Sequence, residues 1–199
     1  MNDIHSDKKA KAAIIIHSSA SASAVAAAAI ATMPVVGPAA LEFPILTAIT
    51  VGMVVVLSRL YGYDPDREKL SAIVSVVLGT ATGSVIALVL FSLIPGVGSG
   101  INAAVTFAIT ETIGWGFFRI LEEGKDPTKL SLSEQKEIYP TGKSERTKEL
   151  EEMKWLTNLP PDVKDKYDQL IKELSKTKQE SEIDRLQTEI MELVSPCKQ

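Results

Sequence analysis

The chain has 199 residues, of which 45% are hydrophobic and 23% charged, and its formal net charge is -4. This acidic balance gives no electrostatic reason to expect nucleic acid as a partner. A single cysteine excludes an intramolecular disulfide and a metal cluster built on cysteines. Because the chain also has only two histidines and no glycine-rich phosphate loop after a strand, we expect a non-enzymatic protein without a metal or cofactor.

Charged side chains divide the sequence into two parts. Only nine side chains between residues 12 and 121 are charged, and five of these nine lie within residues 64–69. Beyond residue 121 charges recur along the whole sequence. This division indicates two solvents, one apolar and one aqueous. We therefore predict an apolar membrane domain over residues 1–124 and a charged, cytosolic helical tail over residues 125–199.

Four apolar segments occupy the first part, at residues 12–33, 41–60, 70–94 and 101–121. Each has about 20 residues or more, close to the ~20 needed to cross ~30 Å of hydrocarbon as a helix. The predicted fold class is therefore all-α, with two tandem hairpins of four apolar, transmembrane helices followed by the charged helical tail. The first segment is rich in Ala and Ser and is only marginally apolar. It either enters the membrane packed against the others or forms a buried core helix in water.

Both predicted hairpins turn at a similar uncharged sequence. The first turn contains Pro34 and Gly37 and the second contains Pro95 and Gly98, each in the order apolar–Pro–x–Val–Gly. Proline ends a helix and glycine permits the turn, so the repetition predicts an internal duplication of a helical hairpin. The turns hold no Lys or Arg, whereas the opposite side holds several. The positive-inside rule therefore places both termini in the cytosol.

Small residues on these segments predict close helix packing, within one chain or between the chains of a homo-oligomer. Helices in lipid gain little from hydrophobic burial against one another, so they associate where small side chains let the backbones approach. The residues expected at such contacts are Gly79 and Gly83 of a GxxxG motif, Ser19 and Ser23 of a small-residue stripe, and Gly114.

Two polar residues lie deep in the apolar segments. Glu111 is near the middle of the fourth segment, where a carboxylate costs about 2.5–3.5 kcal/mol. Two interpretations stay open. Glu111 is an ion, proton or partner site, or it is a protonated carboxyl hydrogen-bonded to nearby Thr hydroxyls. His17, in the first segment, is predicted to be a hydrogen-bonded packing residue rather than a ligand.

The tail carries apolar residues at helical spacing. We expect a helix over residues 144–158, a break at 139–142, and two short amphipathic frames that meet near 176–181, either as a turn between antiparallel helices or as a skip in one helix. The frames are too short for a stable coiled coil, so we expect them to dock on another helix or on a partner protein. The residues predicted for partner binding are Trp155, Leu170, Leu174, Leu186 and Ile190.

A wider pattern covers residues 20–39, 47–62 and 94–100, which combine an Ala/Ser-rich helix, a helix ending in RLYG and the turn IPGVGSG. In this pattern the chain resembles a bacterial domain family of poorly defined function that is fused to, or encoded beside, Era-like GTPases and includes YcjF-like membrane proteins. The resemblance implies a membrane-associated helical domain, in the bacterial inner membrane, that partners a GTPase. Because this chain contains no GTPase domain, such a partner would act in trans.

Three functions fit these observations. The leading hypothesis is a non-enzymatic membrane protein that anchors or couples a cytosolic partner, such as a GTPase, through its tail. The second is a homo-oligomeric pore or channel, which the small-residue faces and Glu111 favour. The third is a soluble, lipid-binding helical bundle whose buried core is built from the same segments.

Overall fold

The computed structural model describes the backbone of residues 2–31, 38–92, 98–149 and 154–197, and the side chains of most of these residues. Every regular element in these ranges is a helix. This confirms the predicted all-α fold class for the described part of the chain.

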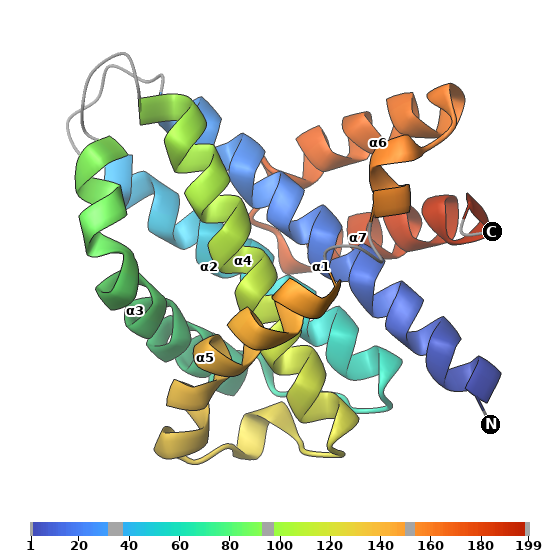
Figure 1. Cartoon of the computed structure of the whole chain (residues 1–199), viewed down its shortest axis with the longest axis horizontal. Helices are drawn as coiled ribbons and strands as arrows, with labels where there is room; N and C mark the ends of the chain where they lie inside the picture. The colour runs from blue at the N-terminus through green and yellow to red at the C-terminus, as the bar shows by residue number, and fades with distance from the viewer. Residues whose placement is uncertain (1, 32–37, 93–97, 150–153, 198–199) are drawn as a thin grey trace.

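Four long helices make up the amino-terminal part and lie as two antiparallel pairs (Figure 1). They are α1 (Asn2–Ala31), α2 (Pro38–Leu60), α3 (Arg67–Ser92) and α4 (Gly98–Glu122). The carboxyl ends of α1 and α3 and the amino ends of α2 and α4 lie together at upper left in Figure 1, and we call this region the hairpin end. Because α1 packs against α4, α2, α6 and α7, it is the central helix of the fold.

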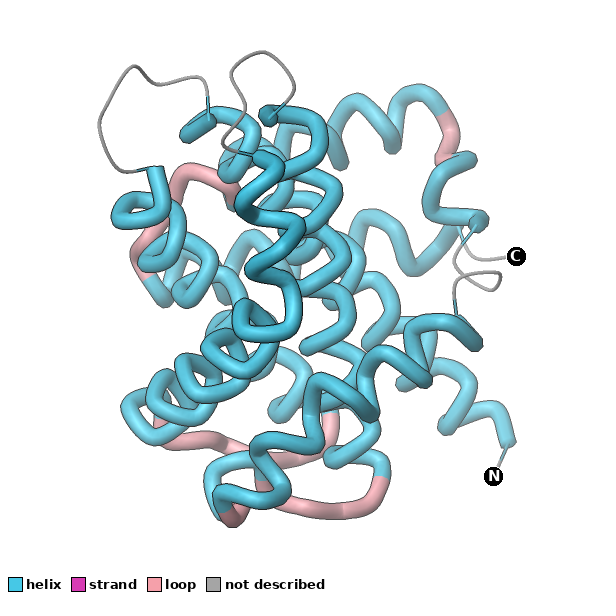
Figure 2. Tube along the Cα trace, turned by 60° about the vertical axis from the view of Figure 1, so that its left-hand side comes forward, coloured by secondary structure: helices cyan, strands magenta, loops and turns pink. Residues whose placement is uncertain are grey.

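Shorter helices follow and surround this group on its other sides (Figure 2). They are η1 (Pro127–Lys129), α5 (Leu132–Glu149), η2 (Lys154–Asn158), α6 (Pro161–Leu174), α7 (Glu180–Val194) and η3 (Ser195–Cys197). The helix α5 packs against α4 and α3. The helices α6 and α7 pack against each other and against α1, and α7 also packs against α2. We call α6 and α7 together the tail hairpin. Its existence confirms a turn, rather than a skip in one helix, between the two amphipathic frames.

The two pairs of long helices end in the same way. Gly62, after α2, has a φ of 84°, and Gly124, after α4, has a φ of 72°, a conformation that favours glycine. In both caps the backbone N–H of the next residue, Tyr63 or Lys125, donates to a carbonyl five residues earlier, at 3.0 and 3.1 Å. This is the hydrogen bond of a Schellman cap. Helices α2 and α4 therefore end in the same type of cap, and the predicted duplication of a helical hairpin stays a prediction.

One hydrophobic core runs through both parts of the chain. It includes fully buried side chains of the long helices, such as Ile15, Leu57 and Trp115, together with the apolar stripes of α6 and α7. The boundary predicted near residue 124 therefore does not separate two cores. The tail covers the apolar helices instead of standing apart from them.

The residues predicted for partner binding lie mostly inside this core. Leu170, Leu174, Leu186 and Ile190 are at most 5% exposed, and Trp155 is half-buried. The structure thus confirms one of the two alternatives for the stripe, docking on another helix, and corrects the assignment of these side chains to a partner surface. The physical reason is the gain of about 1.5–3 kcal/mol for each large apolar side chain that leaves water.

Two described segments are long and apolar enough to cross a membrane. They are Asp7–Ile30 of α1, with 24 residues, and Ala103–Glu122 of α4, with 20 residues. The apolar stretch Pro44–Leu60 of α2 is shorter. By length and composition, two rather than four helices therefore qualify among the described residues. In each of the two, 67% of the most apolar window is buried inside the protein, as in the core helix of a soluble bundle.

The helix α5 continues through Pro140 and Gly142, where the sequence predicts a break, so that prediction is wrong. Tertiary packing explains the difference. A Cβ atom at Gly142 would lie 1.8 Å from the carbonyl oxygen of Thr112 in α4, and one at Gly116 would lie 2.2 Å from the carbonyl oxygen of Ile138 in α5. The backbones of α4 and α5 are in contact, and Gly142 serves this close approach rather than a turn.

The glycines predicted to bring helices together differ in their surroundings. Gly79 is exposed, and a Cβ atom there would meet no described atom within 4 Å outside its own helix. Its predicted role in helix packing, within one chain or between chains, stays a prediction. Gly114 does lie at a helix contact. A Cβ atom there would come within 2.8 Å of Ile16 in α1 and 3.0 Å of Met53 in α2.

Several predicted residues fall outside the described part of the chain. Pro34, Gly37 and Pro95 are among them, and so are the side-chain surroundings of Gly83. Gly98 is the first residue of α4.

Replacing Gly142 by Ala tests the contact between α4 and α5. Because the new methyl group would overlap the Thr112 carbonyl, we expect the free energy of unfolding to fall by about 2–3 kcal/mol. Gly79→Ala is the matched control, since it fills an exposed helix position and should stabilise the chain by about 0.5–1 kcal/mol. Chemical denaturation measures both changes. Equal stability of Gly142→Ala and the wild type would contradict the backbone contact.

Candidate functional site

Glu111 lies at the centre of the molecule, where α4 meets α1 and α5. Its side chain is completely buried. One carboxylate oxygen, Oε2, accepts a hydrogen bond from Nε of Arg146 in α5 at 2.5 Å. The other oxygen, Oε1, lies 3.3 Å from Nδ1 of His17 in α1. A buried carboxylate and a guanidinium thus form a charge-neutral pair that joins the apolar part of the chain to the tail.

His17 completes this cluster from the opposite helix. Because the Glu111 carboxylate can only accept, the Nδ1 atom of His17 carries the hydrogen in this arrangement. The imidazole also packs edge-on against the ring of Phe107, with the ring centroids 5.2 Å apart and an interplanar angle of 80°. These contacts agree with the predicted role of His17 as a hydrogen-bonded packing residue.

The partners of Glu111 differ from those that the sequence predicts. The three threonines near it on α4 are buried, but its hydrogen-bond partners in the described part of the chain are Arg146 and His17. The Thr hydroxyls predicted as hydrogen-bond partners of Glu111 are therefore replaced by Arg146 and His17 in the described structure. Both oxygens of Glu111 are engaged, so the cluster is suited to holding α1, α4 and α5 together.

A second polar contact ties α7 to the ends of α2 and α3. Asp184 accepts from Nη1 of Arg59 at 2.7 Å and from Nη2 of Arg67, both at its Oδ2 atom. Arg67 also lies 3.4 Å from Glu180. Arg59 and Arg67, which lie on the side opposite the predicted turns, are thus paired with carboxylates of the tail.

A third contact is buried between α7, α1 and α2. The side chain of Gln187 is completely buried. Its amide nitrogen donates to the carbonyl oxygen of Gly52 at 3.1 Å, and its oxygen accepts from the N–H of Met53 at 3.2 Å and from the hydroxyl of Ser19 at 2.7 Å. This orientation is the one in which both ends of the amide meet complementary groups.

Gly52 lies where α7 packs closely against α2. A Cβ atom at Gly52 would lie 2.2 Å from Cγ2 of Ile183. Ser19 and Ser23, predicted for helix packing, are both buried, and the hydroxyl of Ser19 faces Gln187. The small residues of α1 and α2 therefore make room for the tail hairpin.

Sequence reasoning missed the tail residues that make these contacts. Arg146, Asp184 and Gln187 belong to a charged region that the sequence assigns to solvent, and each pairs with a residue at least 35 positions away. The one available signal was Glu111 itself. Burying its carboxylate costs free energy unless a cation elsewhere in the chain pairs with it.

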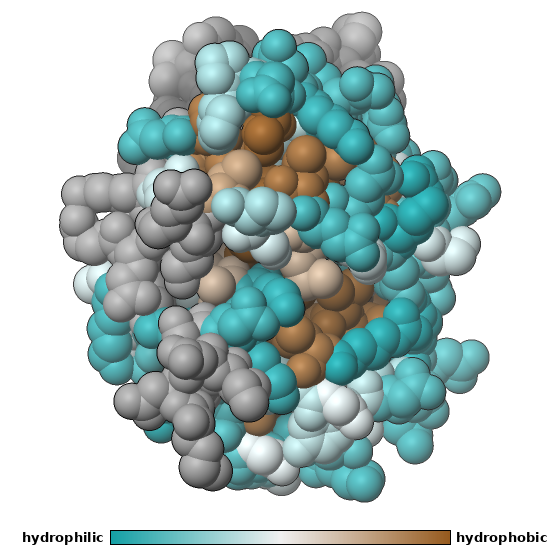
Figure 3. All heavy atoms as spheres, turned by 90° about the vertical axis from the view of Figure 1, so that its right-hand side faces the viewer, coloured by the Kyte–Doolittle hydropathy of each residue, from teal (hydrophilic) through white to brown (hydrophobic). Residues whose placement is uncertain are grey.

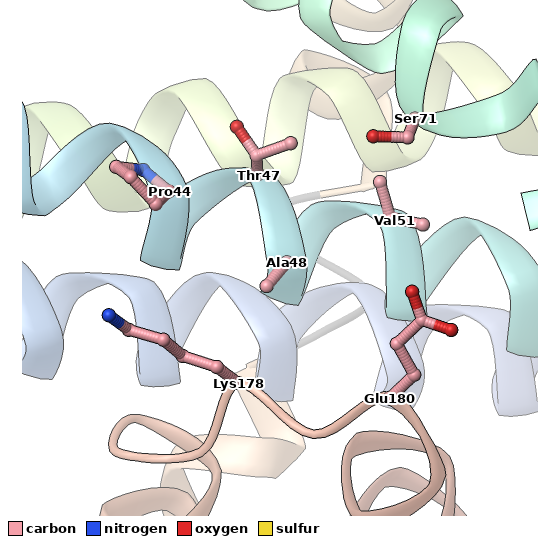
Figure 4. Close-up of a pocket in the computed structure, with 7 residues that line it drawn as sticks. All are labelled: Pro44, Thr47, Ala48, Val51, Ser71, Lys178 and Glu180. Carbon is pink, nitrogen blue, oxygen red and sulfur yellow. The ribbon is translucent and has the colours of Figure 1, made fainter. Parts of the chain in front are cut away.

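A groove of about 310 Å³ opens between α2, α3 and the start of α7 (Figure 4). Apolar and hydroxyl side chains line it together with two charged residues, and one of these, Glu180, lies close to Arg67. Within the described residues no three His, Cys, Asp or Glu side chains gather as metal ligands. The residues that line the groove are Pro44, Thr47, Ala48, Val51, Ser71, Lys178 and Glu180.

Burial also changes the acidity of two phenols beside these contacts. Burial raises the pKa of Tyr167 in α6 to about 12, from an ordinary value of 10.0. Burial, together with the carboxylate of Glu122, raises the pKa of Tyr61. Both phenols stay neutral in the folded chain at a pH where they would ionise in the unfolded chain.

Comparisons of the chain with protein-family models, with curated proteins and with solved structures find no match.

Removing the cation tests whether the buried pair holds α5 in place. Arg146→Met would leave Glu111 buried without a counter-charge, so we expect unfolding to become easier by about 3–5 kcal/mol. Adding Glu111→Met should restore most of this loss, because no buried charge remains. Arg185→Met, at an exposed pair with Glu189, is the control and should cost about 0–1 kcal/mol. If Arg146→Met lowered the free energy of unfolding as little as Arg185→Met, the pair would not hold α5 in place.

The raised phenol pKa values predict a loss of stability in alkali. The unfolded chain releases the Tyr167 proton near pH 10 and the folded chain near pH 12, so stability falls as the pH rises across this window. Across this pH window, Tyr167→Phe should reduce the fall in the free energy of unfolding by about 2–3 kcal/mol. Thermal unfolding at a series of pH values measures it. Parallel pH profiles for the variant and the wild type would contradict the burial of the phenol.

Proposed function

We propose that this chain is a non-enzymatic, membrane-associated helical protein whose apolar helices enter a bilayer with the hairpin end foremost. The observation that carries this proposal is the pair of apolar segments, Asp7–Ile30 and Ala103–Glu122, which are 24 and 20 residues long. A helix of about 20 apolar residues is long enough to span the hydrocarbon.

The placement of the charged helices supports this direction of entry. The hairpin end lies at upper left in Figure 1, while α5 lies at the bottom and the tail hairpin at the right. Between residues 12 and 58 of the sequence Glu42 is the only charged side chain. Entry of α1 and α2 from the hairpin end would therefore bring few charges into lipid, and Glu111 of α4 would enter as a pair with Arg146.

A water-soluble, lipid-binding bundle is the second candidate, because most of both apolar segments is buried inside the protein. In that case α1 is a core helix that does not enter a bilayer. The pore alternative draws less support, since Glu111 is buried and paired with Arg146 rather than lining an open path.

A cytosolic partner, such as a GTPase in trans, remains part of the proposal through the family resemblance. The apolar stripes of α6 and α7 are buried, so such a partner would contact their charged outer faces. Those faces carry exposed residues of both signs, such as Lys172 and Glu173 on α6 and Arg185 on α7.

A lysine at Val25 tests entry of α1 into lipid. Val25 is 38% exposed near the hairpin end, and a lysine in hydrocarbon costs about 2.5–3.5 kcal/mol, so we expect roughly 100-fold weaker binding to vesicles. Leu132→Lys in α5 is the matched control, because Leu132 is 67% exposed on the tail side, and it should bind as the wild type does. Co-sedimentation with vesicles of phosphatidylcholine and phosphatidylglycerol measures both variants.

Two results would contradict the proposal. Wild-type protein that stays in the supernatant at every lipid concentration would favour the soluble bundle. Equal binding of Val25→Lys and Leu132→Lys would show that α1 does not enter the bilayer.

A further inference from the structure

We propose that the face of α1 and α2 beneath the tail hairpin is a bilayer-binding surface, which the tail hairpin covers until lipid takes its place. This inference rests on the proposed membrane function and adds a condition to it. The apolar helix α1 reaches lipid only after α6 and α7 lift away.

The tail hairpin has the shape of a cover. Its inner stripes are buried, and its outer faces carry the charges. On the side of the molecule where α6, α7 and both termini lie, hydrophilic side chains cover much of the surface and apolar atoms show between them (Figure 3). The buried side chains that face inward are Tyr167, Leu170, Ile171 and Leu174 of α6 and Ile183, Leu186, Ile190 and Val194 of α7.

Docking of the tail hairpin and insertion of α1 exclude each other. Gln187 contacts Ser19, which lies at the middle of the segment Asp7–Ile30. The exposed, charged side chains of Arg185 and Glu192 lie on the same helix as Gln187. If α1 crossed a bilayer with α7 still docked, these charges would enter the hydrocarbon, where charged side chains are strongly disfavoured.

The uncovered surface suits lipid. Ser19 and Thr50 can satisfy their hydroxyls by donating to carbonyls of their own helices, both at 2.7 Å. Gln187 and Asp184 would leave with the tail hairpin. Arg59 and Arg67 lie at helix ends, where their side chains can reach lipid phosphates.

The tail hairpin can leave without dismantling the rest of the fold. Its main contacts outside itself are with α1 and α2, whereas α5 is held separately on α4 and α3. The anchor at Asp184 is also incomplete. Both arginines bind its Oδ2 atom, and its buried Oδ1 atom has no hydrogen-bond partner in the described structure. An unpaired buried oxygen favours the state in which water reaches it.

A disulfide across the contact tests this inference. A Cβ atom at Gly52 would lie 3.3 Å from Cβ of Ile183, close to the ~3.5–4.5 Å found in disulfides. Gly52→Cys with Ile183→Cys, in a chain carrying Cys197→Ser, should therefore staple α7 to α2 on oxidation. We expect the oxidised protein to bind phosphatidylcholine–phosphatidylglycerol vesicles at least about tenfold more weakly than the reduced protein. Each single-cysteine variant should be insensitive to the oxidant.

A second variant moves binding in the opposite direction. Asp184→Ala removes the anchor to both arginines, so binding to the same vesicles should strengthen several-fold. Asp168→Ala is the control, because Asp168 pairs only with Lys164 on the outer face of α6 among the described contacts. Circular dichroism of each protein establishes that the helices are intact.

The outcomes separate this inference from the proposed function. If oxidised and reduced proteins bind vesicles equally, the tail hairpin is no cover, although membrane association stands. Failure of the two cysteines to pair would also refute the docked arrangement. If neither redox form binds and the wild type does not bind, the proposed function itself fails and the inference with it.

Discussion

A carboxylate inside an apolar helix requires a partner, and much of this structure follows from how the chain supplies one. Glu111 is completely buried on α4, and its cation, Arg146, comes from α5. Placing that guanidinium at Glu111 brings the backbones of α4 and α5 into contact, which requires glycine at 116 and 142. Burying a charge without a counter-charge costs several kcal/mol, so the apolar part and the tail form one folding unit.

The same principle governs the other polar groups of the apolar part. Arg59 and Arg67 meet Asp184, and Ser19 meets Gln187, so α7 supplies two further partners. The tail covers the long helices in place of solvent. Its apolar stripes pack against their apolar sides, and its polar side chains pair with their few polar atoms. Lipid could replace the apolar stripes of α6 and α7, and its phosphates could replace Asp184 at Arg59 and Arg67, but lipid could not replace Arg146 of α5 at the buried Glu111. This difference makes the tail hairpin the part whose position depends on the surroundings.

Local sequence signals predicted much of the fold. Apolar length identified the four long helices, and the glycine caps at 62 and 124 followed the expected ends of α2 and α4. Those features depend on neighbouring residues. The pairing of Arg146 with Glu111 and of Gln187 with Ser19 depends on residues far apart, which a single sequence does not connect. The break predicted at Pro140 was wrong for the same reason. The packing that accompanies the continuous α5 comes from another helix, α4.

The central claim is that the tail hairpin and a bilayer compete for one face of α1 and α2. Hydrogen exchange of the backbone amides, followed by mass spectrometry with and without phosphatidylglycerol-containing vesicles, tests it most directly. Bound vesicles should speed exchange in α6 and α7 while α1 stays protected, because lipid replaces the tail hairpin against α1. Unchanged protection of α6 and α7 in vesicle-bound protein would contradict the account.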